Sequence, residues 1–372
     1  MIEESSLAKR RKDLQAGSPI RVLVVDDSVV IRSLVPRALA ADPALEVVGT
    51  AAHGRAALAK IPHLTPDVIT LDIEMPQMDG LETLRHLRAA YPEIYVIMFS
   101  SLTESGAAAT LDALTLGAND YVTKLTGENR MEGCIATLRA ELVPKIKQFF
   151  LNAGAPQAKP QPKPETQPFP AFSHAALFSR SLVAIGVSTG GPAALSTIIP
   201  QFPEDFPAPI LIVQHMPPVF TRMLAERLQK NTRLRVEEAT EGATVEPGKV
   251  IIAAGDYHMK VRQQGGRVQI AVDQSAPRNF CRPSVDALFD SVAEVHGSGA
   301  IGVVMTGMGQ DGLLGTQRLK SSGAYVIAQD QASSVVWGMP GFVARAGLAD
   351  ALLPLQELVP EIVKQTGAGR LS

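Results

Sequence analysis

The chain has 372 residues, of which 46% are hydrophobic and 19% charged, and its formal net charge is −2. This length favours two domains, and the composition is that of a globular protein. The small net charge gives no indication of binding to nucleic acid or to an acidic membrane surface. No apolar run approaches the length of a membrane helix, and the charged N-terminus does not resemble a secretory signal. We therefore expect a cytoplasmic protein without membrane insertion.

Residues 1–18 are predicted to be a flexible tail, and residues 19–148 the first domain. Apolar runs typical of strands alternate there with segments of helical pattern. The predicted strands are 20–25, 47–51, 67–71, 95–99 and 120–123, and the predicted helices are 29–40, 54–61, 80–90, 107–116 and 131–150. This alternation predicts an α/β fold with a doubly wound parallel sheet.

Polar residues follow the predicted strands of this domain where each strand ends. The carboxyl ends of parallel strands meet at one edge of the sheet, so these side chains are expected to lie together: Asp26, Asp27, Asp72, Ser100 and Lys124. Neighbouring carboxylates favour a bound Mg²⁺, and the lysine favours a phosphoryl group. Asp72 is the candidate nucleophile for acyl-phosphate formation. Alternatively, any one aspartate is a helix cap.

These residues, with Met75-Pro76 and Asp79-Gly80, resemble the receiver domain of response regulators. The resemblance implies a flavodoxin-like fold, phosphorylation of Asp72, and Mg²⁺ bound by Asp26, Asp27 and Asp72. Glu74 matches the position that lends a backbone carbonyl to the metal. Ser100 matches the switch hydroxyl and Lys124 the phosphate-contacting lysine. Leu125 departs from the family, which usually has proline after the lysine.

Residues 149–178 are predicted to be a linker. Six prolines between positions 156 and 170 alternate with Gln, Lys and Ala. Such a segment builds neither a helix nor a central strand, and it is typical of a semi-extended tether. A ligand for an SH3-like partner is an alternative use.

Residues 179–368 are predicted to be the second domain, again of the doubly wound parallel type. The predicted strands are 182–187, 209–213, 300–305 and 324–328, and the predicted helices are 192–199, 220–229, 284–295 and 313–321. Short strand-like pieces over 235–272 suggest a β-rich insertion with hairpins. Residues 335–363 are expected to be mostly helical.

The first turn of this domain, Gly186-Val187-Ser188-Thr189-Gly190, has the form of a nucleophile elbow. Small residues around Ser188 leave room for another molecule to approach its hydroxyl. Two alternatives remain for the turn alone. It is also typical of an ordinary glycine-rich βα turn and of a phosphate-binding loop at a helix N-terminus.

His215 and Asp311 each follow another predicted strand, which places them at the same sheet edge as Ser188. A serine needs a base to take its proton, and a carboxylate can orient that base, so the three residue types suit acyl transfer. Alone, His215 could be a packed structural histidine and Asp311 a turn residue or cap. The cysteines, Cys134 and Cys281, fit no metal or disulfide framework.

Four segments of the second domain resemble the chemotaxis protein-glutamate methylesterase family: 186–192, 214–217, 282–286 and 306–312. The resemblance implies that Ser188 is the nucleophile, His215 the base and Asp311 the orienting acid. Thr189 and Met308 lie where the supporting and oxyanion contacts are placed. No cofactor is expected for the esterase.

The two resemblances together imply a phosphorylation-activated serine-type esterase of chemotaxis signalling. Its substrates would be methylated glutamates on the cytoplasmic helices of chemoreceptors, and it would also deamidate receptor glutamine. A histidine kinase would be the phosphodonor. The alternative is a non-catalytic regulator that binds a nucleotide or partner at the glycine-rich turn, although the full dinucleotide pattern is missing.

Overall fold

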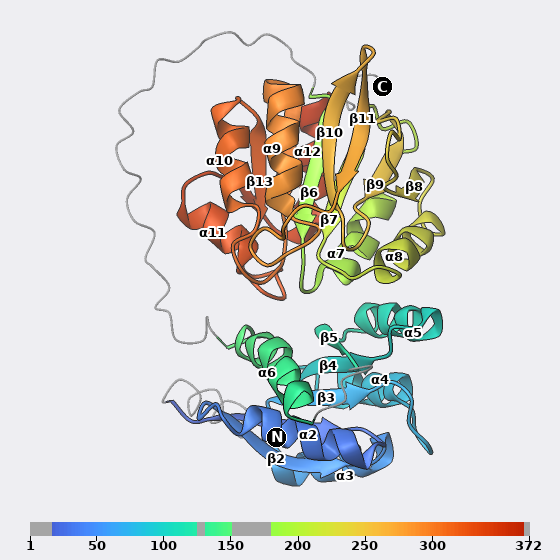
Figure 1. Ribbon diagram of the computed structural model, residues 1–372, viewed down its shortest axis with the longest axis vertical. Coiled ribbons are helices and arrows are strands. Elements are labelled where there is room, and N and C mark those ends of the chain that lie inside the picture. Colours follow the sequence, from blue (N-terminus) through green and yellow to red (C-terminus); the bar gives the residue numbers. More distant parts are fainter. Residues whose placement is uncertain (1–16, 125–130, 151–179, 368–372) are drawn as a thin grey trace.

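The computed structural model describes residues 17–124, 131–150 and 180–367, which form two α/β domains on separate parallel sheets (Figure 1). The N-terminal domain is blue to green in Figure 1, and the C-terminal domain is yellow-green to red. Both sheets confirm the predicted fold class. Most of the expected tail, most of the expected linker and Leu125 lie outside the described residues, and the domain boundaries stay predictions.

The first sheet has five parallel strands in the order β2-β1-β3-β4-β5. In chain order its elements are β1 (Ile20–Val25), α2 (Val29–Leu39), β2 (Leu45–Ala51), α3 (Gly54–Leu64), β3 (Val68–Asp72), α4 (Gly80–Ala90), β4 (Tyr95–Ser100), α5 (Glu104–Thr115), β5 (Asp120–Thr123) and α6 (Met131–Lys147). The strand order reverses between β1 and β3, so their carboxyl ends flank the crevice where such sheets bind ligands.

Gly80 lets helix α4 begin against the end of strand β3. Asp79 caps the helix, since its side chain accepts a hydrogen bond from Glu82 N–H at 2.7 Å. A Cβ atom at position 80 would lie 2.2 Å from the carbonyl oxygen of Asp72. Only glycine permits this approach, which fixes the backbone that carries Asp72.

The second sheet has seven strands in the order β14-β13-β12-β6-β7-β9-β8, and all its pairings are parallel. Its strands are β6 (Leu182–Val187), β7 (Ile210–Gln214), β8 (Arg235–Glu238), β9 (Lys249–Ile252), β12 (Ala300–Val304), β13 (Tyr325–Gln329) and β14 (Ala351–Leu353). The helices of the domain are α7 (Gly191–Ile198), η1 (Ile199–Gln201), α8 (Phe220–Gln229), α9 (Val285–His296), η2 (Gly297–Gly299), α10 (Leu313–Ser321), α11 (Met339–Arg345) and α12 (Leu355–Thr366). None of the helices in the described part of the chain is both long and apolar enough to cross a membrane.

The expected β-rich insertion over 235–272 is wrong in part. Only β10 (His258–Gln264) and β11 (Arg267–Asp273) form a hairpin, whereas β8 and β9 extend the main sheet in parallel. Short apolar runs reveal strands but not their partners, which explains the error. The C-terminal segment also contains the edge strand β14, which is too short for its periodicity to stand out.

Strand β6 lies at the centre of the second sheet, between β12 and β7. The chain leaves β6 toward β7 and later returns to β12 on the other side. The carboxyl ends of these three strands therefore form the topological switch point, where doubly wound sheets place their ligand sites. Ser188 follows β6, His215 follows β7, and Asp311 lies in the loop after β12.

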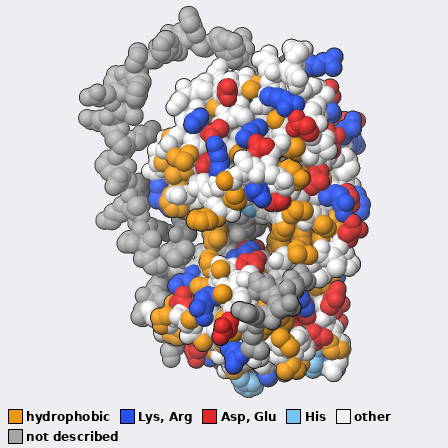
Figure 2. Space-filling view, in the orientation of Figure 1, with side chains coloured by type: hydrophobic (Ala, Val, Ile, Leu, Met, Phe, Trp, Pro, Cys, Tyr) orange, Lys and Arg blue, Asp and Glu red, His pale blue; other side chains and the backbone are white. Residues whose placement is uncertain are grey.

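The first domain packs on the second through α5, which contacts α7 and α8. Tyr121 of β5 stacks on Phe220 of α8, with ring centroids 4.9 Å apart and planes 12° apart. Figure 2 shows hydrophobic side chains gathered on the second domain beside this junction. Two ion pairs also join α8 to α5: Arg222–Glu104 and Arg227–Asp112.

Candidate active site

Ser188 is held in a tight turn between β6 and α7. Its N–H donates to Thr306 O at 2.9 Å, and its carbonyl accepts from Gly191 N–H at 2.8 Å and from Gln214 Nε2 at 3.0 Å. Gly190 adopts a φ of 79°, which favours glycine, and a Cβ atom at Gly191 would lie 1.9 Å from Gln214 Oε1. These contacts build the strand-turn-helix that the sequence predicts.

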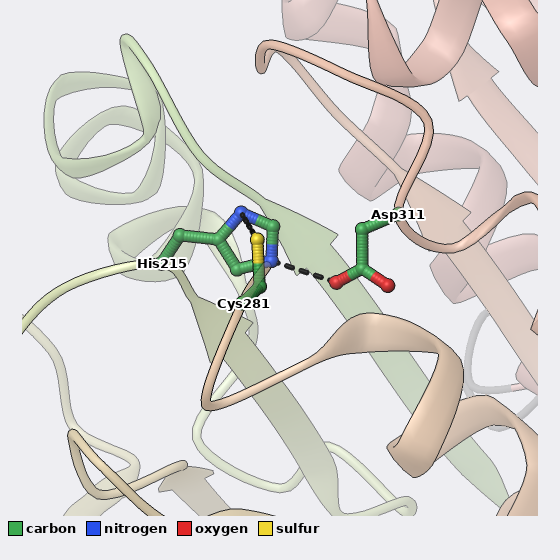
Figure 3. A group of neighbouring side chains, drawn as sticks. All are labelled: His215, Cys281 and Asp311. Carbon is green, nitrogen blue, oxygen red and sulfur yellow. Dashed lines mark hydrogen bonds and ion pairs between the residues drawn. The ribbon is translucent and has the colours of Figure 1, made fainter. Parts of the chain in front are cut away.

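His215 and Asp311 form a close pair beside this turn. His215 Nε2 lies 2.8 Å from Asp311 Oδ2 (Figure 3). Because a carboxylate only accepts, this contact assigns the proton to Nε2 and leaves the lone pair of the neutral ring on Nδ1. The structure therefore brings together the predicted base and the predicted acid.

The Asp311 carboxylate lies at the N-terminus of α9 and is buried. Its Oδ1 accepts from the Ser284 hydroxyl at 2.8 Å, and its Oδ2 accepts from Val285 N–H at 2.7 Å. Asn279 Nδ2 lies 3.2 Å from Oδ1. A helix N-terminus and several donors stabilise a negative charge, so Asp311 is held as an ionised carboxylate in a fixed orientation.

The pair shifts the pKa of both side chains. Burial alone would lower the pKa of His215, but Asp311, and next the Cys281 contact, raise it above its ordinary value. Burial alone would raise the pKa of Asp311, but His215, Val285 N–H and the Ser284 hydroxyl lower it. The Asp311 and Cys281 contacts therefore favour the protonated imidazole, which is the form that has to be stabilised once His215 has taken the serine proton.

His215 Nδ1 faces the thiol of Cys281, with the sulfur 3.7 Å away (Figure 3). Among the described residues, the Ser188 hydroxyl makes no hydrogen bond. Ser188 and His215 line one small cavity of about 50 Å³, together with Asp120 and Tyr121 of the first domain. The serine and histidine thus share a site, but their mutual hydrogen bond is not formed in this arrangement.

Thr189 and Met308 have different surroundings. The Thr189 hydroxyl is buried and lies 3.0 Å from Asp120 Oδ2 and 3.3 Å from Gln148 Oε1, both in the first domain. Met308 is 39% exposed on the loop that carries Asp311. Met308 thus borders the site, whereas the Thr189 side chain is engaged at the domain junction.

The acidic residues of the first domain gather as predicted. One carboxylate oxygen from each of Asp26, Asp27 and Asp72 lies within 4.8 Å of the others. Lys124 Nζ lies 2.7 Å from Asp72 Oδ1 and 3.7 Å from Asp26 Oδ2. Burial, and then repulsion from Asp72, raise the pKa of Asp26 to about 6, although Lys124 opposes them.

This cluster fits a hard divalent cation. Asp26 Oδ2 and Asp72 Oδ2 are buried and accept no hydrogen bond from the described residues. Burial also raises the pKa of Asp72, against the effect of Lys124. Oxygen ligands that lack donors and lie this close together match the ligand set of Mg²⁺.

Ser100 and Glu74 lie around the same cluster. The Ser100 hydroxyl points to α5, where it lies 3.2 Å from Gly106 O and 2.5 Å from Thr110 Oγ1. Glu74 is exposed, and its N–H lies 3.4 Å from Asp72 Oδ1. Ser100 is therefore turned toward α5 and bonded there.

Sequence reasoning missed residues that the structure adds to the second site: Asn279, Cys281, Ser284 and, from the other domain, Asp120. Ser284 directly precedes α9, so a helix-start pattern would have pointed to it. Asn279 and Cys281 lie in an irregular segment without periodicity. No sequence signal joins Asp120 to Thr189.

Two family models match the chain. The model described as CheB methylesterase matches residues 183–362, and the model described as response regulator receiver domain matches residues 22–136. A protein-glutamate methylesterase/protein-glutamine glutaminase from Trichodesmium erythraeum is 49% identical over 349 residues, which are 93% of this chain and 99% of the relative. The chain belongs to this family.

Other members are also similar across both domains. The protein-glutamate methylesterase/protein-glutamine glutaminase of a Nocardioides species is 47% identical over 95% of this chain and 97% of its own length. A crystal structure of the Thermotoga maritima CheB methylesterase catalytic domain is 46% identical and covers 50% of this chain and 98% of that chain, with a TM-score of 0.49. The two family models and the two relatives that match over nearly the whole chain confirm the predicted methylesterase family and its receiver domain.

Proposed function

We propose that this methylesterase hydrolyses glutamate methyl esters on the cytoplasmic helices of chemoreceptors, releases methanol, and deamidates receptor glutamine to glutamate. The proposal places it in the cytoplasm as an adaptation enzyme of chemotaxis. The observation that carries the chemistry is the His215–Asp311 pair at 2.8 Å beside the Ser188 turn. A serine, an oriented base and a buried carboxylate are the groups that acyl transfer needs.

Ser188 acts as the nucleophile. Its oxygen attacks the ester carbonyl while His215 takes the hydroxyl proton through Nδ1. Methanol leaves with that proton, and water then cleaves the acyl-enzyme by the reverse roles. For a glutamine substrate the same route releases ammonia. Asp311 keeps the proton on Nε2 and stabilises the imidazolium that forms.

The loops around Ser188 and Met308 stabilise the negative charge that develops on the carbonyl oxygen. Backbone N–H groups suit this task because they are fixed before the reaction starts. Met308 contributes to this contact through its backbone N–H and not through its side chain. Thr189 supports the turn, since its carbonyl accepts from the Thr306 hydroxyl at 2.8 Å.

Phosphorylation of Asp72 by a histidine kinase controls the esterase. Asp26, Asp27, Asp72 and the Glu74 carbonyl would hold Mg²⁺, which when bound offsets the charge of the incoming phosphoryl group. The phosphoryl group then competes for Lys124 and draws Ser100 away from Gly106 and Thr110. This local change shifts the equilibrium between the closed and the open arrangement of the domain junction toward the open one.

The unphosphorylated receiver restricts access to Ser188. Three observations support this part of the proposal: Asp120 bonds the Thr189 hydroxyl, Tyr121 stacks on Phe220, and both Asp120 and Tyr121 line the cavity that contains Ser188. A methylated receptor helix could not reach the serine without displacing these side chains. Activation therefore requires that the junction opens.

The deciding experiment measures methanol release from methylated receptor by the full-length chain, with and without a small phosphodonor. Ser188→Ala should abolish release while Asp72 is still phosphorylated. Ser196→Ala, at a half-buried position of α7 where the hydroxyl bonds only Pro192 O, is the matched control and should retain activity. Turnover by Ser188→Ala would refute the serine mechanism. A serine-directed covalent probe that failed to label Ser188 would favour a non-catalytic regulator instead.

A further inference from the structure

A tight turn before α9 presents a fully exposed aromatic side chain. Arg278 N–H donates to Cys281 O at 3.1 Å, and Cys281 N–H donates back to Arg278 O at 2.8 Å. Between them, Asn279 and Phe280 have φ values of 48° and 64°, both positive as in a type I′ turn. The Phe280 side chain is 103% exposed, more than any other large hydrophobic residue of the described chain. Its ring therefore buries essentially no surface within the described residues.

Phe280 is an unfavourable residue for the fold at this position. A bulky side chain rarely adopts a positive φ, and glycine is the usual residue at the second central position of such a turn. No apolar burial offsets this strain, because the ring is exposed. Strained residues of this kind are found mainly at functional sites. The ring is therefore a candidate for a contact with another molecule.

The turn touches both catalytic groups that orient the serine chemistry. On one side of Phe280, Asn279 Nδ2 lies 3.2 Å from Asp311 Oδ1. On the other side, the Cys281 sulfur lies 3.7 Å from His215 Nδ1 (Figure 3). Phe280 and His215 also line one cavity of about 420 Å³, whose walls come from both domains. A molecule that reaches His215 through this cavity passes the Phe280 ring.

The charges beside the turn indicate what kind of partner the ring suits. Arg278 pairs with Asp290 and Arg282 pairs with Asp256, each at 2.6 Å and each within the second domain. These two arginines are therefore engaged and do not favour an anionic partner such as a nucleic acid. The turn offers an apolar ring, which suits apolar side chains on the surface of a protein.

We propose that Phe280 is a specificity-determining residue whose ring packs against apolar side chains of the substrate helix beside the methylated glutamate. Residues three and four positions apart lie on the same face of a helix, so side chains about one turn from the glutamate approach the enzyme together with it. The role of Phe280 rests on the proposed function, because it takes the receptor helix as the substrate. The ring acts on binding and not on the chemical step.

The test measures KM and kcat for methanol release from methylated receptor by the full-length chain with a small phosphodonor. Phe280→Ala should raise KM by about tenfold or more, because it removes the apolar area that the ring would bury, and kcat should stay close to that of the wild type. Phe280→Leu should restore most of the affinity. Leu352→Ala is the matched control, since Leu352 is a 50% exposed side chain on the edge strand β14, and its KM should not change.

A glycine variant separates binding from folding. Phe280→Gly relieves the positive φ and should raise the melting temperature by a few degrees, while its KM rises as in Phe280→Ala. A variant that merely damaged the fold would lower the melting temperature instead. A rise in stability together with a loss of affinity is therefore the signature of a residue kept for contact with the substrate.

Binding to the inactive Ser188→Ala chain makes the test independent of turnover. Its Kd for methylated receptor should rise by about tenfold or more when Phe280→Ala is added. An unchanged Kd, or a fall in kcat with an unchanged KM, would overturn the role of Phe280. If the wild type released no methanol while Phe280→Ala still weakened receptor binding, the proposed esterase activity would fail and the Phe280 contact would stand.

Discussion

The hydroxyl of Thr189, the residue after the candidate nucleophile, lies 3.0 Å from the carboxylate of Asp120 in the receiver domain. Asp120 is also bonded by Lys145 at 2.9 Å and by Gln148 at 3.1 Å, both in or next to α6. The catalytic turn is thus tied to a buried polar cluster of the other domain. Any rearrangement of the receiver's edge strand must break or remake this contact.

Weakening the aromatic contact at the junction should activate the unphosphorylated enzyme. Tyr121→Ala removes the ring that stacks on Phe220, and such pairs contribute about 0.5–1.5 kcal/mol beyond area burial. We expect methanol release without phosphodonor to rise about two- to tenfold. Tyr95→Ala is the control, because Tyr95 stacks on Phe149 within the receiver at 4.4 Å. Equal rates for both variants would argue against the junction as the restraint.

The ion pairs between α8 and α5 should act in the same direction, with an effect that salt weakens. Arg222 and Arg227 pair with the exposed Glu104 and Asp112, and exposed pairs contribute only about 0.2–1 kcal/mol each. The double variant Arg222→Ala/Arg227→Ala should raise unstimulated activity by about two- to thirtyfold at low salt and less at high salt. Arg233→Ala breaks a pair inside the second domain and should change nothing. If these pairs restrain the enzyme, added salt should raise the unstimulated activity of the wild type toward that of the double variant. No such rise would argue against the ion pairs as a restraint.

Loss of the phosphoacceptor should uncouple the two domains. Asp72→Asn should bring the ratio of stimulated to unstimulated methanol release to one, because no acyl phosphate can form on the amide. Asp42→Asn, which alters an acid paired with Lys147 away from the cluster, should keep the stimulation. Stimulation that survives in Asp72→Asn would mean that another residue accepts the phosphoryl group.

Asp311, and not the neighbouring Asp286, should be the acid that the base requires. In Asp311→Asn the amide can donate to Nε2 and so favours the tautomer without a lone pair on Nδ1, and kcat should fall by about 10³–10⁴-fold. Asp286 accepts from Gly315 N–H at 2.7 Å and from Asn279 at 2.8 Å, but does not contact His215. Asp286→Asn should therefore lower the melting temperature, whereas its kcat should stay close to that of the wild type. A larger loss of kcat in Asp286→Asn than in Asp311→Asn would reject the assignment of Asp311.

Glu141 on α6 should make stability depend on pH. Burial raises the pKa of its carboxyl above the ordinary value, although Lys145 and Thr123 N–H oppose the shift. The folded chain then holds a proton that the unfolded chain releases, so the contribution of Glu141 to stability falls as pH rises from the unfolded pKa through the folded pKa. Above that window Glu141→Gln should melt at a higher temperature than the wild type, and below both pKa values the two should coincide.

Calorimetry of the full-length chain across a pH series would measure this difference. Glu132→Gln, an exposed change on the same helix, serves as the comparison and should show no such trend. A Glu141→Gln difference that stays constant with pH would show that the carboxyl does not titrate in a buried setting.

Much of the architecture was predictable because buried strands and helices alternate clearly in both domains. The strand-end rule placed Ser188, His215 and Asp311 together, and it worked because β12, β6 and β7 are neighbours in the sheet. The same reasoning gathered Asp26, Asp72 and Lys124. Pairing partners were less visible, so β8 and β9 were assigned to an insertion.

The contacts that refine the site were not predictable from the sequence. Cys281 reaches His215 because an irregular segment between β11 and α9 folds over the strand ends, and such a path has no periodic signal. Cysteine spacing could not reveal that Cys281 would lie against a histidine from a distant loop. The Thr189–Asp120 bond depends on how the two domains pack. The hydrophobic pattern of one domain does not indicate where the other domain will contact it.

Strand β5 is only four residues long, yet it connects the phosphoacceptor site to the domain junction. Tyr121 on it touches the catalytic domain, and Lys124 directly after it touches Asp72. Three residues of extended backbone span about 10 Å. Asp72 is therefore linked to the Tyr121–Phe220 contact by only a short piece of extended chain. A receiver domain transplanted from another protein would need to preserve this edge strand.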